Sequence, residues 1–100
     1  MGIPVSYRIG KTITAAIAMD LSTGGMAIRT NKPPVRGTVI KVKFALPGSK
    51  RELDVEGVVC WSVPKAGVGV QFTTVKITDQ TVINGFVDAH FFRSVKIEAK

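Results

Sequence analysis

The sequence is poor in the residues that form disulfides, metal sites and active sites. It has one cysteine, Cys60, one histidine, His90, and 7 acidic residues in 100. One cysteine cannot close an internal disulfide, and one of each residue is too few for a structural zinc site. We interpret Cys60 as a small buried residue and His90 as a packing or helix-end residue. With no nucleophile and base to pair, we expect no enzymatic activity and no bound cofactor or metal.

Segments that target a protein to or across a membrane are also lacking. No uncharged apolar stretch approaches the roughly 20 residues that a spanning helix needs. The first ten residues lack the basic head, apolar stretch and small-residue cleavage site of a secretory signal. We therefore expect a cytoplasmic protein without membrane insertion.

Apolar residues and positive charge, in contrast, are plentiful. Hydrophobic residues make up 45% of the chain, and 14 Lys+Arg against 7 Asp+Glu give a formal net charge of +7. This balance supports a packed core and is too apolar for a disordered chain. Because no internal repeat or low-complexity run divides the sequence, we expect residues 1–100 to form a single domain.

Turn-forming residues divide the chain into short apolar runs. Runs of roughly 5–10 residues between clusters of glycine, proline and small polar residues are typical of strands. Apolar and polar residues alternate most clearly in the fourth and fifth runs, which predicts one buried and one solvated face. The six predicted strands cover residues 3–9, 12–19, 25–30, 38–46, 51–63 and 67–73.

The fourth and fifth strands also predict their own pairing. A hairpin with its loop at 47–50 places Lys43 opposite Asp54 and Lys41 opposite Glu56. Each exposed cross-strand pair contributes only about 0.2–1 kcal/mol, but two pairs that agree on one register support that register. We interpret these charges as solvated strand surface rather than as a ligand site.

After the sixth strand the pattern becomes helical. Thr78 is a candidate N-cap, Asp79 falls in the first turn, and apolar residues recur at helical spacing, which predicts an amphipathic helix near residues 79–91. Gly85 indicates either close packing or a weak helix at that point. The tail, 93–100, is interpreted as a short strand or a frayed end.

Together these elements predict a mostly-β fold, a six-stranded antiparallel β-barrel closed by a C-terminal α-helix. A closed barrel is favoured because closure removes exposed sheet edges. The predicted core consists of the inward-facing apolar residues Phe44, Leu53, Val55, Val68, Val70, Phe72, Ile83 and Phe86.

The segment 20–26, Asp-Leu-Ser-Thr-Gly-Gly-Met, is the strongest candidate site. Two short polar side chains two residues apart, followed by two glycines, bring backbone amides and side-chain oxygens together at a concave turn. These residues alone leave two interpretations open. The segment is either a ligand site or a tight turn in which Asp20 and Ser22 bond only to the local backbone.

Several short motifs follow one another in a fixed order along the chain. They are DxSxxG at 20–25, a Leu-Pro-Gly turn at 46–48, valines and a tryptophan in 55–61, alternating glycines and valines in 67–72, and a helix with Ile83 and Phe86-Val87. In this order they resemble the PilZ domains, the bacterial cyclic di-GMP receptor family. The likeness covers about residues 5–90 and implies a six-stranded barrel with a C-terminal helix, which agrees with the fold expected from the pattern.

The resemblance implies a regulatory module whose ligand is cyclic di-GMP. In the family, the Asp, Ser and Gly of the turn hold the dinucleotide, and these correspond to Asp20, Ser22 and Gly25. An RxxxR segment before the first strand supplies the rest of the family's site, and it has no match in this chain. The arginines that we consider as substitute phosphate contacts are Arg8, Arg29 and Arg36.

Two explanations for the missing arginine pair stay open. Either the pair belongs to a segment upstream of Met1 in a longer protein, or the chain belongs with the PilZ domains that lack the pair and act through protein partners. Because each charge-assisted hydrogen bond contributes about 1.5–3 kcal/mol, the loss of two costs about 3–6 kcal/mol, roughly a 10²- to 10⁴-fold loss of affinity. We expect this chain to bind cyclic di-GMP no tighter than tens of micromolar.

Three functions remain open from the sequence. The first is a cyclic di-GMP receptor module that changes its contact with an adjacent domain or partner protein. The second is a PilZ-like adaptor that binds no dinucleotide and acts through protein partners in type IV pilus, motility or polysaccharide control. The third, suggested by the charge of +7, is a basic barrel that binds single-stranded nucleic acid; it is disfavoured because Tyr7 and Trp61 lack neighbouring aromatics to form a stacking platform.

Overall fold

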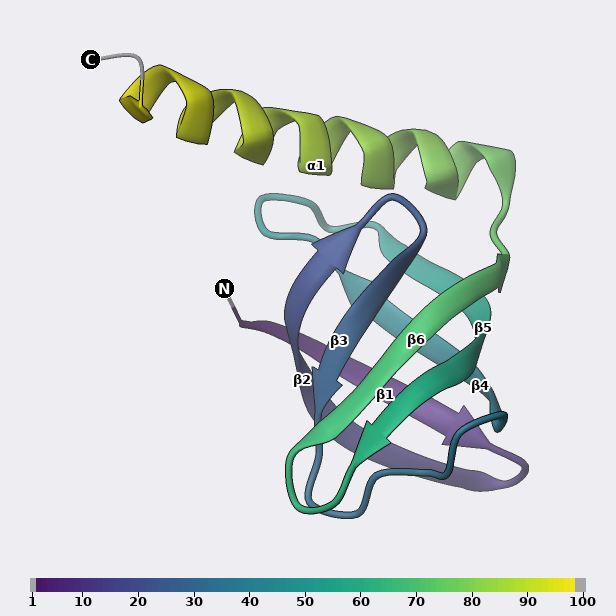
Figure 1. Ribbon diagram of the computed structural model, residues 1–100. Helices are drawn as coiled ribbons and strands as arrows, with labels where there is room; N and C mark the ends of the chain where they lie inside the picture. Colours follow the sequence, from purple (N-terminus) through teal and green to yellow (C-terminus); the bar gives the residue numbers. More distant parts are fainter. Residues whose placement is uncertain (1, 99–100) are drawn as a thin grey trace.

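The strands lie close to where the residue pattern places them, and the helix starts near its predicted beginning but extends beyond its predicted end (Figure 1). The computed structural model describes residues 2–98, with side chains described through residue 89. In this part of the chain the elements are β1 (Ile3–Ile9), β2 (Thr12–Ser22), β3 (Gly25–Arg29), β4 (Val39–Ala45), β5 (Glu52–Val63), β6 (Gly67–Thr74) and α1 (Ile77–Glu98).

The six strands form a closed antiparallel barrel in the order β1-β2-β3-β6-β5-β4. The barrel closes because β1 pairs with β2 on one side and with β4 on the other. Between β4 and β5, Lys43 lies opposite Asp54 and Lys41 opposite Glu56. Both the expected barrel and the expected register are therefore confirmed.

The core fills the inside of the barrel with the inward-facing residues of all six strands. Six of the eight predicted core residues are buried, whereas Phe72 and Phe86 are half-buried and pack against the cluster. Tyr7 is also buried, and its hydroxyl lies 3.0 Å from the hydroxyl of Thr30. This bond lets a polar group enter the core, because a buried hydroxyl without a partner would be costly.

The helix starts earlier than the sequence predicts. The Gln80 amide donates to the Lys76 carbonyl at 2.8 Å, so Lys76 and not Thr78 stands at the N-cap. Thr78 instead accepts a hydrogen bond from the Arg51 guanidinium at 3.0 Å. The prediction of a Thr78 cap was therefore wrong, because a tertiary contact uses that hydroxyl.

The helix also extends further than the predicted end near residue 91. Its backbone is helical to Glu98, so 93–98 form neither a strand nor a separate tail, and residues 99–100 lie outside the described part. A side chain added at Gly85 would meet open space, which excludes close packing as the reason for this glycine. The side chain of His90 lies outside the described side chains, so its predicted role is not tested.

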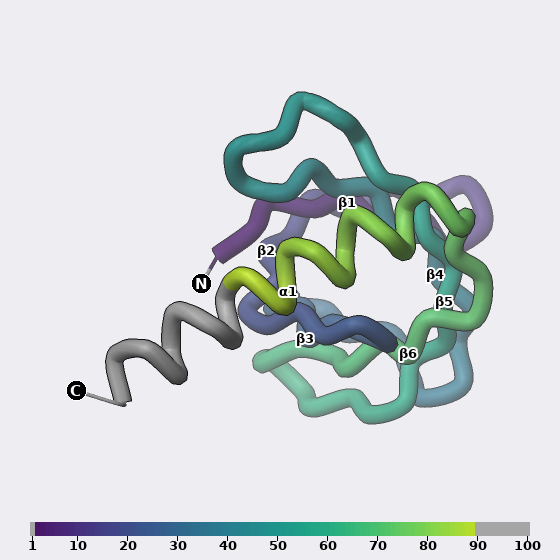
Figure 2. The backbone as a smooth tube through the Cα atoms, turned by 90° about the horizontal axis from the view of Figure 1, so that it is seen from above, coloured from purple at the N-terminus to yellow at the C-terminus, as the bar shows by residue number. Residues whose placement is uncertain are grey.

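Helix α1 lies across one end of the barrel and covers that opening (Figures 1 and 2). Ile83 is fully buried there, and Val82, Phe86 and Val87 pack against the core cluster. Beside them, the Arg51 guanidinium lies 2.5 Å from the carboxylate of Asp79, which is itself buried. One end of the barrel is therefore closed by apolar contact and an ion pair, while the other end carries only loops.

Candidate functional site

Asp20 and Ser22, the two polar side chains of the candidate site, lie at the end of strand β2 rather than in a loop. β2 extends to Ser22, beyond its predicted end at residue 19. Its pairing with β3 shifts between Ala18 and Asp20, which marks a bulge. Because a bulge changes which way the following side chains point, both Met19 and Asp20 are exposed on the outer face.

The turn between β2 and β3 is held from three directions. The Ser22 hydroxyl donates to the Gly25 carbonyl at 3.2 Å, and the Phe72 amide of β6 donates to the Gly24 carbonyl at 2.8 Å. From above, the Gln80 side-chain amide of α1 donates to the Thr23 carbonyl at 2.9 Å. The turn is therefore fixed to both the barrel and the helix.

The Asp20 carboxylate is exposed, and no described residue forms a hydrogen bond or ion pair with it. Ser22, in contrast, has its hydroxyl proton engaged with Gly25, as the purely structural interpretation of the turn requires. Gly25 is required sterically, because a side chain there would collide with the Val70 carbonyl of β6. The structure therefore leaves the carboxylate as the free acceptor of the turn.

A cavity of about 360 Å³ brings these residues together with others far away in the sequence. Asp20, Ser22 and Gly25 form one side of it. Strands β5 and β6 supply residues that sequence reasoning did not assign to the site, namely Cys60, Trp61, Gly69, Val70 and Gln71.

Trp61 is held at this cavity by its partner strand. It pairs with Gly69 across β5 and β6, and a side chain on Gly69 would overlap the indole ring. The indole therefore lies over a glycine, half-exposed on the outer face of the barrel. The signal available in the sequence was a tryptophan on one strand and a Gly-Val-Gly stretch on the next, but only the register shows that the two meet.

Cys60 is exposed, so its prediction as a buried residue was wrong. The pairing of β5 with β6 shifts between Val59 and Trp61, and this bulge moves Cys60 out of the buried row. Its thiol donates to the Gly69 carbonyl at 3.3 Å. The apolar neighbours of Cys60 in the sequence gave no sign of the bulge.

The three candidate arginines do not line the 360 Å³ cavity. Arg8 lies on the outer face of β1 opposite Lys41 and borders a separate cavity of about 150 Å³. Arg29, at the end of β3, borders a cavity of about 540 Å³, and Arg36, in the β3–β4 loop, borders one of about 670 Å³. Trp61 borders both of these last two cavities as well as the first, so they adjoin the candidate site without belonging to it.

Among the described residues, no group of three or more histidine, cysteine and acidic side chains is placed to hold a metal ion. Within the same part of the chain, no helix has the length and hydrophobicity needed to cross a bilayer.

Comparison with known proteins gives one family, and the similar solved structures include the two described below. The PilZ domain model matches residues 1–89. The inhibitor of motility MotI/DgrA from Bacillus subtilis superposes with a TM-score of 0.80 at 15% identity, over 93% of this chain and 48% of that one, so this chain spans about half of its length. The PilZ domain of CeSA from a cellulose-synthesizing bacterium superposes with a TM-score of 0.68 at 22% identity, over 89% of this chain and 92% of that one. The search of curated protein sequences finds no match.

Proposed function

The chain belongs to the PilZ domain family, and from this premise we propose that it is a regulatory module that binds cyclic di-GMP at the 360 Å³ cavity. The observation that carries the proposal is the meeting of Asp20, Ser22 and Gly25, the residues of the DxSxxG motif, with Trp61 in that one cavity. The chain then acts by binding and not by catalysis.

The chemistry of the cavity suits a guanine base. The free carboxylate of Asp20 accepts hydrogen bonds from the N–H groups on the edge of guanine, while the Ser22 hydroxyl retains lone pairs for a further donor. The half-exposed indole of Trp61 offers a flat face to a ring. Base recognition is thus the part of the site that this chain supplies.

The cavity offers little to bind the phosphates of the ligand. Among the residues that line the cavity there is one carboxylate and no arginine or lysine. The ligand carries two phosphate charges, and without charge-assisted hydrogen bonds these lose about 3–6 kcal/mol of stabilisation. We therefore propose weak binding, no tighter than tens of micromolar.

Binding is read out through helix α1. The Gln80 side chain joins the helix to the Thr23 carbonyl within the ligand turn, and the buried carboxylate of Asp79 joins it to Arg51 in the β4–β5 loop. A ligand that changes the turn also changes the helix, which an adjacent domain or partner protein can detect. This contact connects the site with the regulatory output.

The second candidate is an adaptor that acts through protein partners without the dinucleotide. It is favoured by the Ser22–Gly25 hydrogen bond, which satisfies the turn locally, and by the lack of cationic residues lining the cavity. Nucleic-acid binding is a weaker candidate, since the ring of Tyr7 is buried and unavailable for stacking.

Calorimetric titration with cyclic di-GMP separates these candidates. We expect a dissociation constant between tens of micromolar and about one millimolar, and at least a ten-fold weakening in Asp20→Ala, which removes a charged hydrogen-bond acceptor. The matched control is Asp54→Ala, an exposed acidic residue on β5 that lies opposite Lys43 and outside the cavity.

Two results would contradict this proposal, the first its weak affinity and the second the receptor function itself. Sub-micromolar binding would mean that other residues replace the arginine pair, with Arg8, Arg29 and Arg36 as the first variants to test. Absence of binding at millimolar ligand, both in this chain and in a version with an upstream arginine pair, would leave the adaptor as the function.

A further inference from the structure

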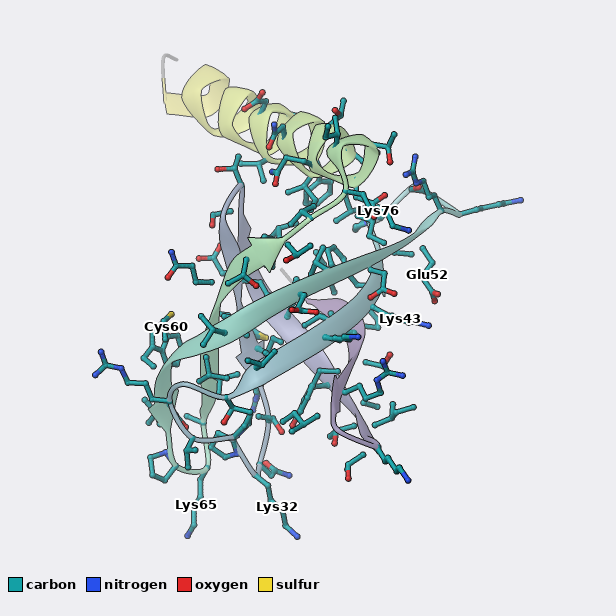
Figure 3. The ribbon with its side chains drawn as sticks, turned by 90° about the vertical axis from the view of Figure 1, so that its right-hand side faces the viewer. Lys32, Lys43, Glu52, Cys60, Lys65 and Lys76 are labelled. Atoms are coloured by element: carbon teal, nitrogen blue, oxygen red, sulfur yellow. The ribbon has the colours of Figure 1, made fainter. Side chains whose placement is uncertain are left out.

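Among the described residues, the connections at the end of the barrel opposite helix α1 carry positive charge and no carboxylate. Three connections meet there, at residues 10–11, 30–38 and 64–66, and we call them together the distal end. Figure 3 shows Lys32 and Lys65 projecting from this end, far from Lys76 beside the helix. The cationic residues of the distal end are Lys11, Arg29 at the close of β3, Lys32, Arg36 and Lys65.

The acidic residues lie elsewhere because of their placement in the sequence. None occurs in residues 1–19, 21–51 or 57–78, and these stretches include all three distal connections. The acidic residues that do occur before the helix are Asp20, under the helix, and Glu52, Asp54 and Glu56 on β5. The distal cations therefore have no carboxylate within their own loops to neutralise them.

The same end exposes aliphatic side chains beside these cations. Val35, between Pro34 and Arg36, is 74% exposed, and Ile13, at the β1–β2 hairpin, is 68% exposed. The 670 Å³ cavity is bordered on one side by Val35 and Arg36 of the β3–β4 loop. On the other side it is bordered by Trp61 of β5 and by Lys65 of the β5–β6 turn. Val35 thus borders one hollow together with the cations Arg36 and Lys65, while Ile13 lies at the β1–β2 hairpin of the same end.

The combination of groups limits the partner. Proteins that bind single-stranded nucleic acid typically place several aromatic stacking faces between their cations, whereas Trp61 is the one exposed aromatic side chain among the described residues of this surface. A partner strand cannot add to the sheet, because the barrel is closed and has no free edge. An anionic membrane surface matches both features, since its headgroups attract cations and its interfacial region accepts short aliphatic side chains and tryptophan.

We propose that the distal end is a docking surface for a membrane rich in anionic phospholipid. Lys32, Arg36 and Lys65 lie at the headgroups, and Val35 and Ile13 reach the boundary between headgroups and acyl chains. Docking of this kind is peripheral and needs no spanning helix. It leaves helix α1 and the Asp20 turn on the side that faces away from the membrane (Figure 1).

Co-sedimentation with vesicles tests the proposal on the whole chain, without cyclic di-GMP. We expect binding to phosphatidylcholine vesicles that contain phosphatidylglycerol, little binding to phosphatidylcholine alone, and weakening as salt is raised. Trp61 is the chain's one tryptophan and borders the docking surface, so its fluorescence emission should shift to the blue on binding. Inorganic phosphate at equal ionic strength should not displace the vesicles.

Matched variants locate the surface. Lys32→Ala combined with Arg36→Ala should weaken binding about 25-fold, since each cation at an anionic surface is worth about five-fold. Lys50→Ala combined with Lys76→Ala removes the same charge near the helix and should change binding by less than about two-fold, because charges farther than a Debye length act weakly. Val35→Ser should weaken binding about ten-fold without a change in charge.

The proposal is overturned if anionic vesicles do not bind or if the two charge pairs have equal effects, which would indicate non-specific attraction by net charge. Displacement by inorganic phosphate would reveal a phosphate pocket instead of a membrane surface. If a single-stranded oligonucleotide binds with loss in Lys32→Ala/Arg36→Ala and vesicles do not, the surface recognises nucleic acid. Circular dichroism of each variant verifies that the fold is retained.

Discussion

At the helix end of the barrel, Ile83 is fully buried, Gln80 bonds to the Thr23 carbonyl, and the buried Asp79 carboxylate pairs with Arg51. At the distal end, Val35 and Lys32 point into solvent. At the helix end, the apolar and charged groups therefore stabilise the fold itself. The distal end keeps the same kinds of groups free, so they are available for a partner.

The two ends also divide the proposed functions. The DxSxxG turn lies at the helix end, where a change in the turn can reach α1 through Gln80. Five cations gather at the distal end, and none of them lines the cavity where phosphates would need them. The unequal placement of charge is thus one reason both for the weak dinucleotide binding that we propose and for the proposed docking surface.

The largest effect is expected when two arginines are added at the helix end. β1 starts at Ile3 opposite Ala18, two residues before Asp20, so an RxxxR segment joined upstream of Ile3 begins beside the candidate site. We expect calorimetry to show about 10²- to 10⁴-fold tighter binding of cyclic di-GMP, because two charge-assisted contacts are regained. The same segment with glutamine at both arginine positions is the control. Equal affinities of the two versions would show that the site cannot use the pair.

A smaller effect is expected from the core beneath the helix. Ile83→Ala should lower the free energy of unfolding by about 2–5 kcal/mol, because it removes a fully buried side chain and leaves a cavity. Val35→Ala at the distal end should change it by less than about 0.5 kcal/mol, as is usual for exposed positions. Urea unfolding measures both, and similar losses in the two variants would contradict the contrast between the ends.

The smallest effect concerns the link between the helix and the turn. Gln80→Ala removes the hydrogen bond to the Thr23 carbonyl and should cost about 0.5–1.5 kcal/mol. Amide exchange at residues 22–25 should accelerate up to about ten-fold if the loss falls on the turn. Thr81→Ala is the control, because its hydroxyl bonds only to the Ile77 carbonyl within the helix. Unchanged exchange in Gln80→Ala would mean that β6 alone holds the turn.

Most of the fold could be predicted because its determinants are local. Alternation in the fourth and fifth strands identified the buried face, and the charges of Lys43 and Asp54 identified the register. What failed were positions at which a neighbouring strand or loop intervenes. Cys60 is exposed by a bulge that depends on β6, and Thr78 lost its capping role to Arg51, which lies 27 residues earlier.

The candidate site was only half predictable for the same reason. Asp20, Ser22 and Gly25 form a short motif whose spacing is visible in the sequence. Trp61 joins them in the cavity only because β5 and β6 pair so that it lies over Gly69. No pattern within a single segment contains that contact.

By itself, the sequence determined the strands, their turns, the buried faces and the DxSxxG motif, since each depends on residues within a few positions of one another. The tertiary structure alone decided which distant groups meet. Closure of the barrel brought the connections at 30–38 and 64–66 to one end and left the β2–β3 turn at the other. Side chains separated by tens of residues come together only when the strands pair, because the register and closure of the whole sheet set their positions.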